Sequence, residues 1–319
     1  MKVVMINDCA HVGETMIRYF PNDVDVVHLR RSRGFLDKTA RITWKILKAK
    51  ADIYHCHYLL QDCWLALKFR KHPIIGHAHG SDVRQSIKHF TWGRIVRHNL
   101  EKCDKIVVST PNLLKTAKQY NDSAEYIPNL VNERVFYPRA QERAKNKMRV
   151  LIAGASDWDV KGTDKIIRAL KRIEKNVNVS IIEYGVDIDK TLKLAKTLDL
   201  HVNALPPVPH ADMPEYYWSA DTVIASIGIG GTLGMAALEA IAYGRPVITR
   251  VSSDFSEYKV FPLLDISTPE EIADAILSSR DENLWKKEHE YFRSYHNSKK
   301  VTKRFMKIYH DLIRGKKSD

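Results

Sequence analysis

The sequence is short of cysteine and lacks any long apolar run, and each lack narrows the classes of protein to which it can belong. The four cysteines, Cys9, Cys56, Cys63 and Cys103, are scattered and form no C-x-x-C pair. This spacing argues against a disulfide framework or a cysteine-based metal site and predicts ordinary thiols in a reducing compartment. No stretch is apolar enough to cross a bilayer, and the first residues have no signal-peptide pattern. We therefore expect a cytoplasmic protein.

Acidic residues are also in short supply. The chain has 51 Lys and Arg against 38 Asp and Glu, a formal net charge of +13. The excess is local, because residues 30–50 hold eight Lys or Arg and one acid, Asp37. Such a bias predicts an anionic partner: a membrane surface, a nucleic acid or a phosphorylated substrate. No nucleic-acid recognition motif accompanies it, so we expect no nucleic-acid partner.

The basic segment has the periodicity of an interfacial helix. If a helix begins at Phe35, the cations fall on one stripe and Leu36, Ala40, Trp44 and Leu47 fall on another face. This pattern is typical of a helix on a membrane surface, with a tryptophan at the boundary. An ordinary surface helix with a solvated basic face is the alternative. The predicted membrane patch, which would make a peripheral contact with the cytoplasmic membrane face, consists of Lys38, Arg41, Trp44, Lys45 and Lys48.

The order of strands and helices predicts two α/β domains. In each half, short apolar strands alternate with helical stretches, and a buried strand restarts the pattern at Arg149. A length of 319 residues also favours two cores over one. The segment before the restart is irregular and basic, which is typical of a linker. We predict an N-terminal domain over 1–138, a linker over 139–148, a C-terminal domain over 149–297 and a closing helix over 298–319.

Four histidines lie near the ends of two predicted parallel strands of the first half. His55 and His57 end one strand, and His77 and His79 end the next. The carboxyl ends of parallel strands form the ligand-binding edge of such a sheet. A metal site would lack a carboxylate or cysteine partner at a useful spacing. We predict a polar substrate site, with His79 the best candidate because Gly80 follows it, and a structural histidine is the alternative.

A strand, a glycine turn and a helix in the second half predict an anion site. The turn holds Gly228, Gly230 and Gly231, and the helix after it carries one acid, Glu239. Backbone N–H groups and a helix N-terminus would meet at one point there. Lys161 precedes another helix start, where it could neutralise a diphosphate, although a solvated lysine is the alternative. Gly13 lies in a turn before the first helix, which is either a phosphate loop or a plain tight turn.

These motifs together resemble one enzyme family. The relevant segments are A-D-I-Y-H-C-H, H-A-H-G-S-D, K-I-V-V-S-T-P, I-P-N-L-V-N-E-R-V-F-Y-P, V-K-G-T-D-K-I-I-R-A-L, P-H-A-D-M-P-E-Y-Y-W-S-A-D and G-M-A-A-L-E-A-I-A-Y-G-R-P-V-I-T. In this order they resemble the retaining, nucleotide-sugar-dependent glycosyltransferases of family 4, which have the GT-B fold. The likeness runs nearly from end to end, and the last segment is its most specific part.

The resemblance implies two Rossmann-like domains facing across a cleft, with the closing helix crossing back to the first domain. The first domain would bind a glycan or lipid-linked acceptor and the second a UDP- or GDP-sugar. It assigns His79 to the sugar as the catalytic candidate, with Asp82 and Arg84 as acceptor or sugar contacts. Lys161 would contact the diphosphate and Glu239 the ribose. The full donor-binding set is Gly13, Lys161, Gly231, Thr232, Leu233, Gly234 and Glu239. We expect no cofactor besides the donor, and no metal, since no D-x-D motif is evident.

Three motifs depart from the family pattern. Gly231 stands where the first glutamate of the E-x7-E motif belongs, and Ser156 where an arginine is common. The P-N-G-V-D turn has become P-N-L-V-N, with Leu130 and Asn132. The sequence therefore leaves two hypotheses open. One is a glycosyltransferase with an altered grip on its donor, and the other is a degenerate, non-catalytic protein that acts as a nucleotide-binding or scaffold subunit.

Overall fold

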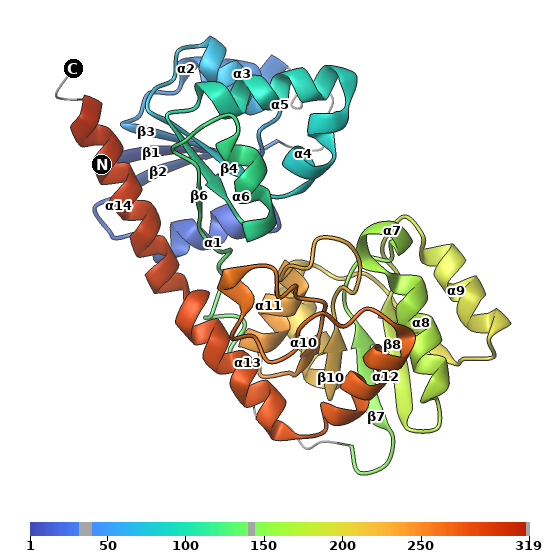
Figure 1. Ribbon diagram of the computed structural model, residues 1–319. Coiled ribbons are helices and arrows are strands. Elements are labelled where there is room, and N and C mark those ends of the chain that lie inside the picture. Colours follow the sequence, from blue (N-terminus) through green and yellow to red (C-terminus); the bar gives the residue numbers. More distant parts are fainter. Residues whose placement is uncertain (32–39, 140–143, 317–319) are drawn as a thin grey trace. The chain divides into compact units, whose positions relative to one another are not determined.

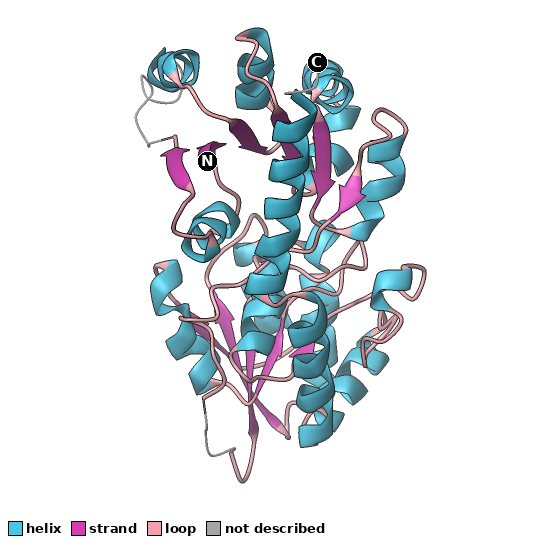
Figure 2. Ribbon diagram, turned by 90° about the vertical axis from the view of Figure 1, so that its left-hand side faces the viewer, coloured by secondary structure: helices cyan, strands magenta, loops and turns pink. Residues whose placement is uncertain are grey.

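The computed structural model describes residues 1–31, 40–139 and 144–316, which form two compact units (Figure 1). Unit 1 consists of Met1–Leu130 and Asn297–Asp319, and unit 2 consists of Val131–His296. In each unit a parallel sheet lies between two layers of helices (Figure 2). The predicted doubly wound α/β architecture is thus confirmed for each unit.

The sheet of unit 1 has six parallel strands in the order β2-β1-β3-β4-β5-β6. The strands are β1 Lys2–Ile6, β2 Asp25–Leu29, β3 Ile53–His57, β4 Ile74–Ala78, β5 Lys105–Val108 and β6 Glu125–Tyr126. The central strands β3 and β4 are buried at every position, as expected for strands covered on both faces. In their register His57 lies beside His77, which places the predicted histidines on one face of the sheet.

Helices cover both faces of this sheet. The helical segments are α1 Val12–Tyr19, α2 Ile42–Lys48, α3 Gln61–Lys68, α4 Ser81–Arg84, η2 Ser86–Lys88, α5 Phe90–Lys102, η3 Pro111–Leu113, α6 Leu114–Lys118 and α14 Ser298–Lys316. One face carries α2, α3 and α5 in a row, and the other carries α1 and α14, which pack on each other (Figure 1). The core under the row of helices includes Ile46, Ala66 and Val96, one side chain from each helix.

The sheet of unit 2 has five parallel strands in the order β11-β10-β7-β8-β9. The strands are β7 Met148–Ile152, β8 Val177–Ile182, β9 Val202–Leu205, β10 Thr222–Ile224 and β11 Val247–Ile248. The restart predicted at Arg149 lies in β7, the first strand of this sheet along the chain.

Two hydrophobic cores flank this second sheet. The helical segments of the unit are α7 Trp158–Lys161, α8 Thr163–Arg172, α9 Ile188–Thr197, η4 His210–Asp212, α10 Met213–Ser219, α11 Met235–Ala242, η5 Ser256–Tyr258, α12 Pro269–Ser278 and α13 Glu282–Tyr295. Helices α8 and α12 share one core, through Ile166 and Ile272. Helices α10, α11 and α13 share the other, through Tyr217, Leu238 and Phe292.

Two helices differ from the expectation. Sequence analysis overlooked α13, whose inner face includes a buried acid, Glu288, among Tyr291 and Phe292. Burial raises the pKa of Glu288 well above its usual range, which favours the uncharged form of this carboxyl. The basic helix expected from Phe35 is present as α2, Ile42–Lys48, and residues 32–39, including Phe35 and Lys38, lie outside the described residues. None of the helices within the described ranges is both long and apolar enough to cross a membrane.

Candidate functional site

The loop after β1 has an unusual backbone. Asn7, Ala10 and His11 all have positive φ, at 64°, 46° and 62°. Residues other than glycine adopt this left-handed region rarely and at a cost, and such residues concentrate at functional sites. The loop lies at the carboxyl end of β1, which is paired on both sides in the sheet of unit 1, and ligands bind at this edge of doubly wound sheets.

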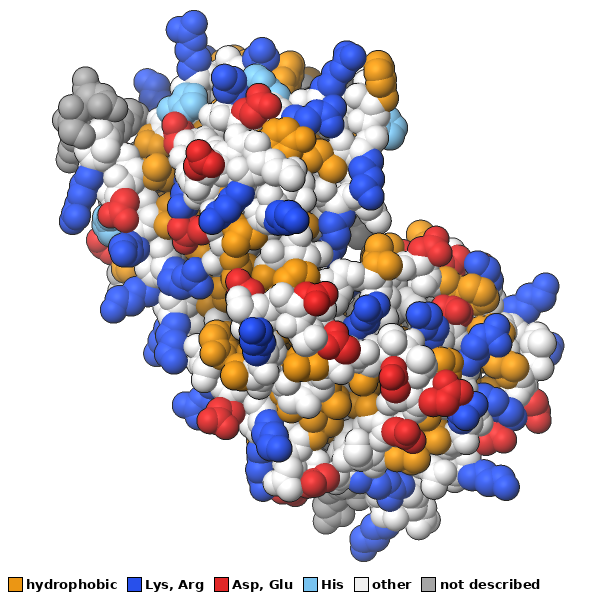
Figure 3. Space-filling model, viewed as in Figure 1, with side chains coloured by type: hydrophobic (Ala, Val, Ile, Leu, Met, Phe, Trp, Pro, Cys, Tyr) orange, Lys and Arg blue, Asp and Glu red, His pale blue; other side chains and the backbone are white. Residues whose placement is uncertain are grey.

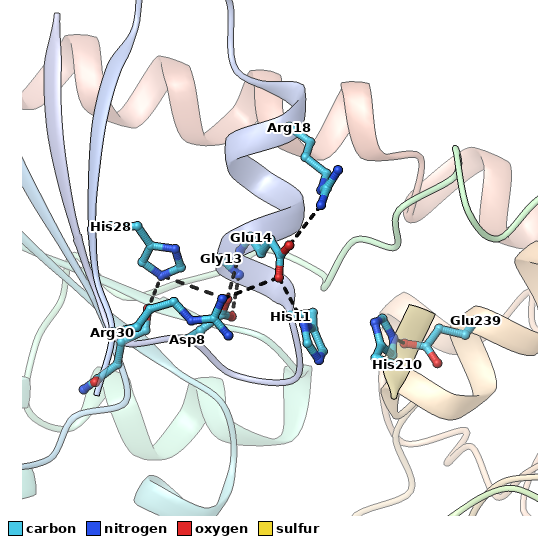
Figure 4. Close-up of polar contacts among 10 residues, drawn as sticks. Asp8, His11, Gly13, Glu14, Arg18, His28, Arg30, His210 and Glu239 are labelled. Atoms are coloured by element: carbon cyan, nitrogen blue, oxygen red, sulfur yellow. Dashed lines mark hydrogen bonds and ion pairs between the residues drawn. The ribbon is translucent and has the colours of Figure 1, made fainter. Parts of the chain in front are cut away.

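Asp8 in this loop closes the N-terminus of α1. Its carboxylate accepts the N–H groups of Gly13 at 2.8 Å and Glu14 at 3.0 Å (Figure 4). Gly13 is also required sterically, because a Cβ there would lie 2.9 Å from His57 Nε2. The N–H of Gly13 is thus already used within the protein. The predicted contact of Gly13 with a donor phosphate stays a prediction, and it would require the phosphate to replace a carboxylate.

The four predicted histidines form one layer on the sheet of unit 1. His55 Nε2 lies 3.1 Å from His77 Nδ1, and His57 Nδ1 lies 2.9 Å from His79 Nε2. Tyr309 of α14 closes one end of the layer, with its hydroxyl 2.6 Å from His55 Nδ1. Each histidine therefore has a hydrogen-bond partner in this layer, while His57 Nε2, His77 Nε2 and His79 Nδ1 have none among the described residues.

Burial keeps this layer neutral. It lowers the pKa of His55, His77 and His79 well below the usual range, and it lowers the pKa of His57 to about 4. His79 lies nearest the end of the strand, and its buried Nδ1 has no partner among the described residues. A neutral ring with a spare nitrogen can donate or accept one further hydrogen bond.

Within the described chain, one group of three side chains has the spacing of a metal site. The ring nitrogens of His55, His57 and His77 lie within 4.8 Å of one another. Two of these rings already bond each other, His55 also bonds Tyr309, and the group contains no carboxylate or thiolate. We therefore interpret the layer as hydrogen-bonded packing, and the prediction of a metal-free site stays a prediction.

Asp82 and Arg84 support the loops around His79. Asp82 is fully buried, and its carboxylate accepts backbone N–H groups from Leu59, His79, Gly80 and Val83. These bonds join the turns that follow β3 and β4, which is a positioning role. Arg84 packs over Gly80, and burial lowers its pKa. The predicted contact of Asp82 with an acceptor or sugar would need this buried carboxylate to be uncovered.

A pocket of about 430 Å³ opens in unit 1 beside the loop after β1. Its wall combines carboxylates, amides, two arginines and aromatic rings, contributed by Asn7, Asp8, Arg30, Arg31, Tyr58, Leu60, Gln61, Asp62 and Trp92. Arg31 donates to the buried Asp62 through Nε at 2.6 Å, which fixes the guanidinium in the wall. Sequence analysis missed this pocket because its residues come from separate loops. Asp8, a helix-capping residue directly after a strand, was the one readable signal.

In unit 2, backbone contacts hold Lys161 beside the glycine turn. The N–H of Ile227 donates to the carbonyl of Lys161 at 2.9 Å. Gly162 has φ 67°, and a Cβ there would lie 3.2 Å from the nitrogen of Gly228. A Cβ on Gly228 would in turn meet the backbone of Val160. Both glycines are therefore needed for this approach. The hydroxyl of Thr163, the first residue of α8, bonds the backbone of Asp157.

The glycine turn presents free N–H groups between two anchors. Its first anchor is the bond from Ile227, and its second is the N–H of Ser252, which donates to the carbonyl of Gly231 at 3.0 Å. Between Gly231 and α11, the N–H groups of Thr232 and Leu233 bond no atom of the described chain. The N-terminus of α11 follows at once, with its own unpaired donors. Such a row of donors suits an anion.

The two departures from the family pattern are built into the backbone. Gly231 has φ 53°, and a Cβ on it would lie 2.7 Å from Ser252 Cβ. Ser156 is fully buried, and its hydroxyl lies 2.7 Å from Thr191 Oγ1. Its N–H donates to the carbonyl of Tyr184 at 2.7 Å. An arginine at position 156 would have no room, and a glutamate at position 231 would strain the turn.

Both oxygens of Glu239 are hydrogen-bonded within unit 2. Oε1 lies 2.7 Å from His210 Nε2 (Figure 4). Oε2 accepts the hydroxyl of Tyr217 at 3.0 Å. Tyr217 is fully buried, whereas the side chain of His210 is 27% exposed. Glu239 thus has one partner that is partly open to solvent, His210, and one that is buried, Tyr217. Sequence analysis gave His210 and Tyr217 no role, although both lie in a segment quoted for the resemblance.

Comparison with known families divides the chain in the same two halves. A model described as Glycosyltransferase Family 4 matches residues 11–135, and one described as Glycosyl transferases group 1 matches residues 147–280. No curated protein matches the chain.

Solved structures share the fold over nearly the whole chain. Sucrose-phosphate synthase from Thermosynechococcus elongatus is 18% identical, with a TM-score of 0.77 over 99% of this chain and 100% of the other. Anabaena Alr3699/HepE, crystallised with UDP and glucose, is 13% identical, with a TM-score of 0.78 over 98% and 100%. S. aureus TarM, crystallised as a mutant with Fondaparinux, α-GlcNAc-glycerol and UDP, is 14% identical, with a TM-score of 0.61 over 84% and 58%.

The histidine layer predicts a loss of stability in acid. In the unfolded chain histidines titrate near pH ~6.5, whereas the layer stays neutral well below that. Below pH ~6.5 the unfolded state therefore binds more protons, so the free energy of unfolding rises with pH. The stabilisation that the histidine layer provides is complete above pH ~6.5. It is lost progressively as the pH falls towards about 4, the pKa of His57. Each buried histidine contributes up to about 1.4 kcal/mol per pH unit. Urea denaturation at several pH values measures the slope.

His77→Gln should reduce the slope of the free energy of unfolding against pH by the equivalent of about one proton, since it removes one titrating ring. His89→Gln is the matched control, because His89 is exposed and lies outside the layer. Equal slopes for wild type and His77→Gln would contradict the assignment.

Gly231 predicts a second stability effect. Gly231→Glu and Gly231→Ala should each lower stability by about 1–2 kcal/mol, because a side chain at positive φ is strained and here also meets Ser252. Gly234→Ala is the matched control, since its φ is −88° and no atom lies within 4 Å of its Cβ position. Calorimetric melting of the three variants compares them. A Gly231→Glu protein that melts with the wild type would show that the turn accepts the carboxylate.

Proposed function

Since the chain belongs to the glycosyltransferases of the GT-B fold, we propose that it moves a sugar from a UDP- or GDP-sugar to a glycan or lipid-linked acceptor, with retention of the anomeric configuration. The observation that carries the proposal is the glycine turn of unit 2. There Lys161 is tied by its backbone to a row of unpaired N–H groups at a helix N-terminus. The HepE and TarM structures were crystallised with UDP, which supports a uridine nucleotide as the first donor to test.

The chemistry proposed for this turn is stabilisation of the departing diphosphate. Negative charge grows on the leaving group as the glycosidic bond to the donor breaks. The ammonium of Lys161, the N–H groups of Thr232 and Leu233, and the positive end of α11 would all favour that charge. A charge-assisted hydrogen bond of this kind is worth roughly 1.5–3 kcal/mol. The turn is fixed at both ends, so its donors would need little reorganisation during the reaction.

Glu239 is proposed to hold the ribose by exchanging one of its partners. The bond from buried Tyr217 fixes Oε2, whereas His210, which bonds Oε1, is partly open to solvent. A ribose hydroxyl would replace His210 at Oε1 and leave the bond from Tyr217 in place. The carboxylate would then remain paired before and after the nucleotide arrives, which avoids a buried unpaired charge.

The acceptor is proposed to bind in the pocket of unit 1. Its aromatic, amide and carboxylate side chains are groups that bind a sugar ring and its hydroxyls, and the TarM structure contains a GlcNAc-glycerol. The neutral ring of His79, with one unpaired nitrogen, would make a hydrogen bond to the transferred sugar. Because its pKa is depressed, the ring would serve as a neutral donor or acceptor and not as a cation.

A second function is favoured by Gly231 and Ser156. The family's glutamate and arginine are absent from these positions, and each replacement fits its backbone closely. A protein that binds nucleotide without transferring sugar would have the same structure. Incubation with UDP- and GDP-sugars separates the two functions: release of nucleotide supports the transferase, and tight nucleotide binding without any release over the whole donor set supports the degenerate subunit.

Lys161→Ala tests the diphosphate site. We expect its dissociation constant for UDP or GDP to rise roughly tenfold to a hundredfold, since one charge-assisted phosphate contact is lost. Isothermal titration calorimetry measures the change. Lys165→Ala is the matched control, because Lys165 is an exposed lysine of α8. Unchanged affinity in Lys161→Ala would remove this lysine from the site, and a wild-type protein that binds neither nucleotide would overturn the proposal.

A further inference from the structure

Large aromatic side chains are exposed on the outer surface of the α2, α3 and α5 layer of unit 1. Trp44 is 60% exposed, Phe90 75% and Trp92 40%. Single exposed apolar residues are normal on proteins, but several large aromatics on one layer of helices call for a partner. The inner faces of the same helices pack in the core of the unit. The exposed rings are not part of that core and are free to contact a partner.

Cations accompany these rings. The guanidinium of Arg94 lies 4.6 Å from the centre of the Phe90 ring, and the ammonium of Lys68 lies 5.4 Å from the centre of the Trp64 ring. On α2, Lys45 and Lys48 follow Trp44 within one turn. Figure 3 shows Lys and Arg side chains gathered with apolar ones over this end of unit 1. Aromatic and cationic groups thus occur together on three helices, whereas the sequence predicted a membrane patch on one helix only.

Acids are nearly absent from this surface. In the described residues of α2, α3, η2 and α5 the acidic side chains are Asp62 and Glu101. Asp62 is buried and bonds Arg31, so it adds no free negative charge to the exterior. The surface therefore carries a positive field in which the aromatic rings are embedded. This combination is typical of interfacial binding, in which cations meet anionic headgroups and tryptophans lie at the lipid boundary.

We propose that this basic–aromatic face docks unit 1 on an anionic lipid bilayer. The face consists of Trp44, Lys45, Lys48, Trp64, Lys68, Phe90, Trp92 and Arg94. Phe90 and Trp92 insert at the level of the headgroups from the first turn of α5, and Trp44 does so from the first turn of α2. The lysines and Arg94 pair with lipid phosphates. Charge complementarity selects a bilayer with negative headgroups over a neutral one.

The docked face also reaches the pocket of unit 1. Trp92 belongs to both, since its ring lines the pocket together with Arg30 and Arg31. An acceptor whose lipid tail stays in the bilayer could therefore enter the pocket with its headgroup. This step rests on the proposed transferase function, whereas the docking itself does not.

Vesicle flotation tests the docking. Wild-type protein should float with vesicles that contain phosphatidylglycerol and remain below neutral phosphatidylcholine vesicles. The double substitution Trp44→Ala and Phe90→Ala should lower vesicle binding by roughly tenfold or more, because two apolar side chains that would enter the bilayer are lost. Lys45→Glu, Lys48→Glu and Arg94→Glu together should lower it at least as much, and added salt should weaken the wild type. Trp92 is left intact because it lines the pocket.

Matched substitutions on unit 2 serve as controls. Lys175→Glu, Lys193→Glu and Lys196→Glu change the net charge equally at exposed lysines, and Val260→Ala removes an exposed apolar residue. The proposal predicts that these variants float as the wild type does. Equal loss in both charge variants, or full binding by Trp44→Ala with Phe90→Ala, would overturn it. UDP titration of every variant separates the two proposals, since a failed transferase leaves flotation intact and failed docking leaves nucleotide binding intact.

Discussion

The arrangement of unit 2 depends on one close approach between two backbones. A Cβ on Gly228 would meet the carbonyl of Val160, Gly162 beside it has φ 67°, and Ile227 donates to the carbonyl of Lys161 across the same contact. The contact joins the end of α7 to the loop after β10, two segments far apart in sequence. It brings a lysine to the start of a glycine turn whose other end is held by Ser252. The anion site is therefore a property of the backbone, to which Lys161 adds charge.

At the carboxyl edge of its sheet, unit 1 presents polar side chains where unit 2 presents backbone N–H groups. Its polar groups are side chains, and they are buried in a layer where each histidine bonds a neighbour. Burial holds the pKa of these rings low, so the layer carries no charge and needs no counterion. The layer ends at His79, whose Nδ1 is unpaired within the described chain. A neutral support whose last ring keeps an unpaired Nδ1 suits contact with an uncharged sugar hydroxyl.

The sequence was a good guide to the sheets because their strands are nearly continuous apolar runs with turn residues between them. Helix α13 escaped because Glu288 interrupts its apolar face, and only the tertiary burial that favours the uncharged form of this acid makes the helix amphipathic. The sequence showed that Glu239 is an acid in an otherwise apolar helix. It did not show the hydrogen-bond partners of this acid, because His210 and Tyr217 belong to a different segment. The pocket of unit 1 was also hidden, because it joins three loops and an α5 tryptophan that no periodicity connects.

The two departures from the family pattern belong together when their surroundings are compared. A glutamate at position 231 would be strained at φ 53° and would meet Ser252, and an arginine at position 156 would replace the buried hydroxyl that contacts Thr191. Neither position is a simple deletion of a charged group from a frame that still fits it. The turn without a carboxylate instead exposes N–H donors at Thr232 and Leu233. Donors of this kind select oxygen atoms that accept hydrogen bonds, whereas a carboxylate selects hydroxyls that donate them. The departure at position 231 therefore leaves donors where the family has an acceptor, and such donors suit the phosphate oxygens proposed for this turn.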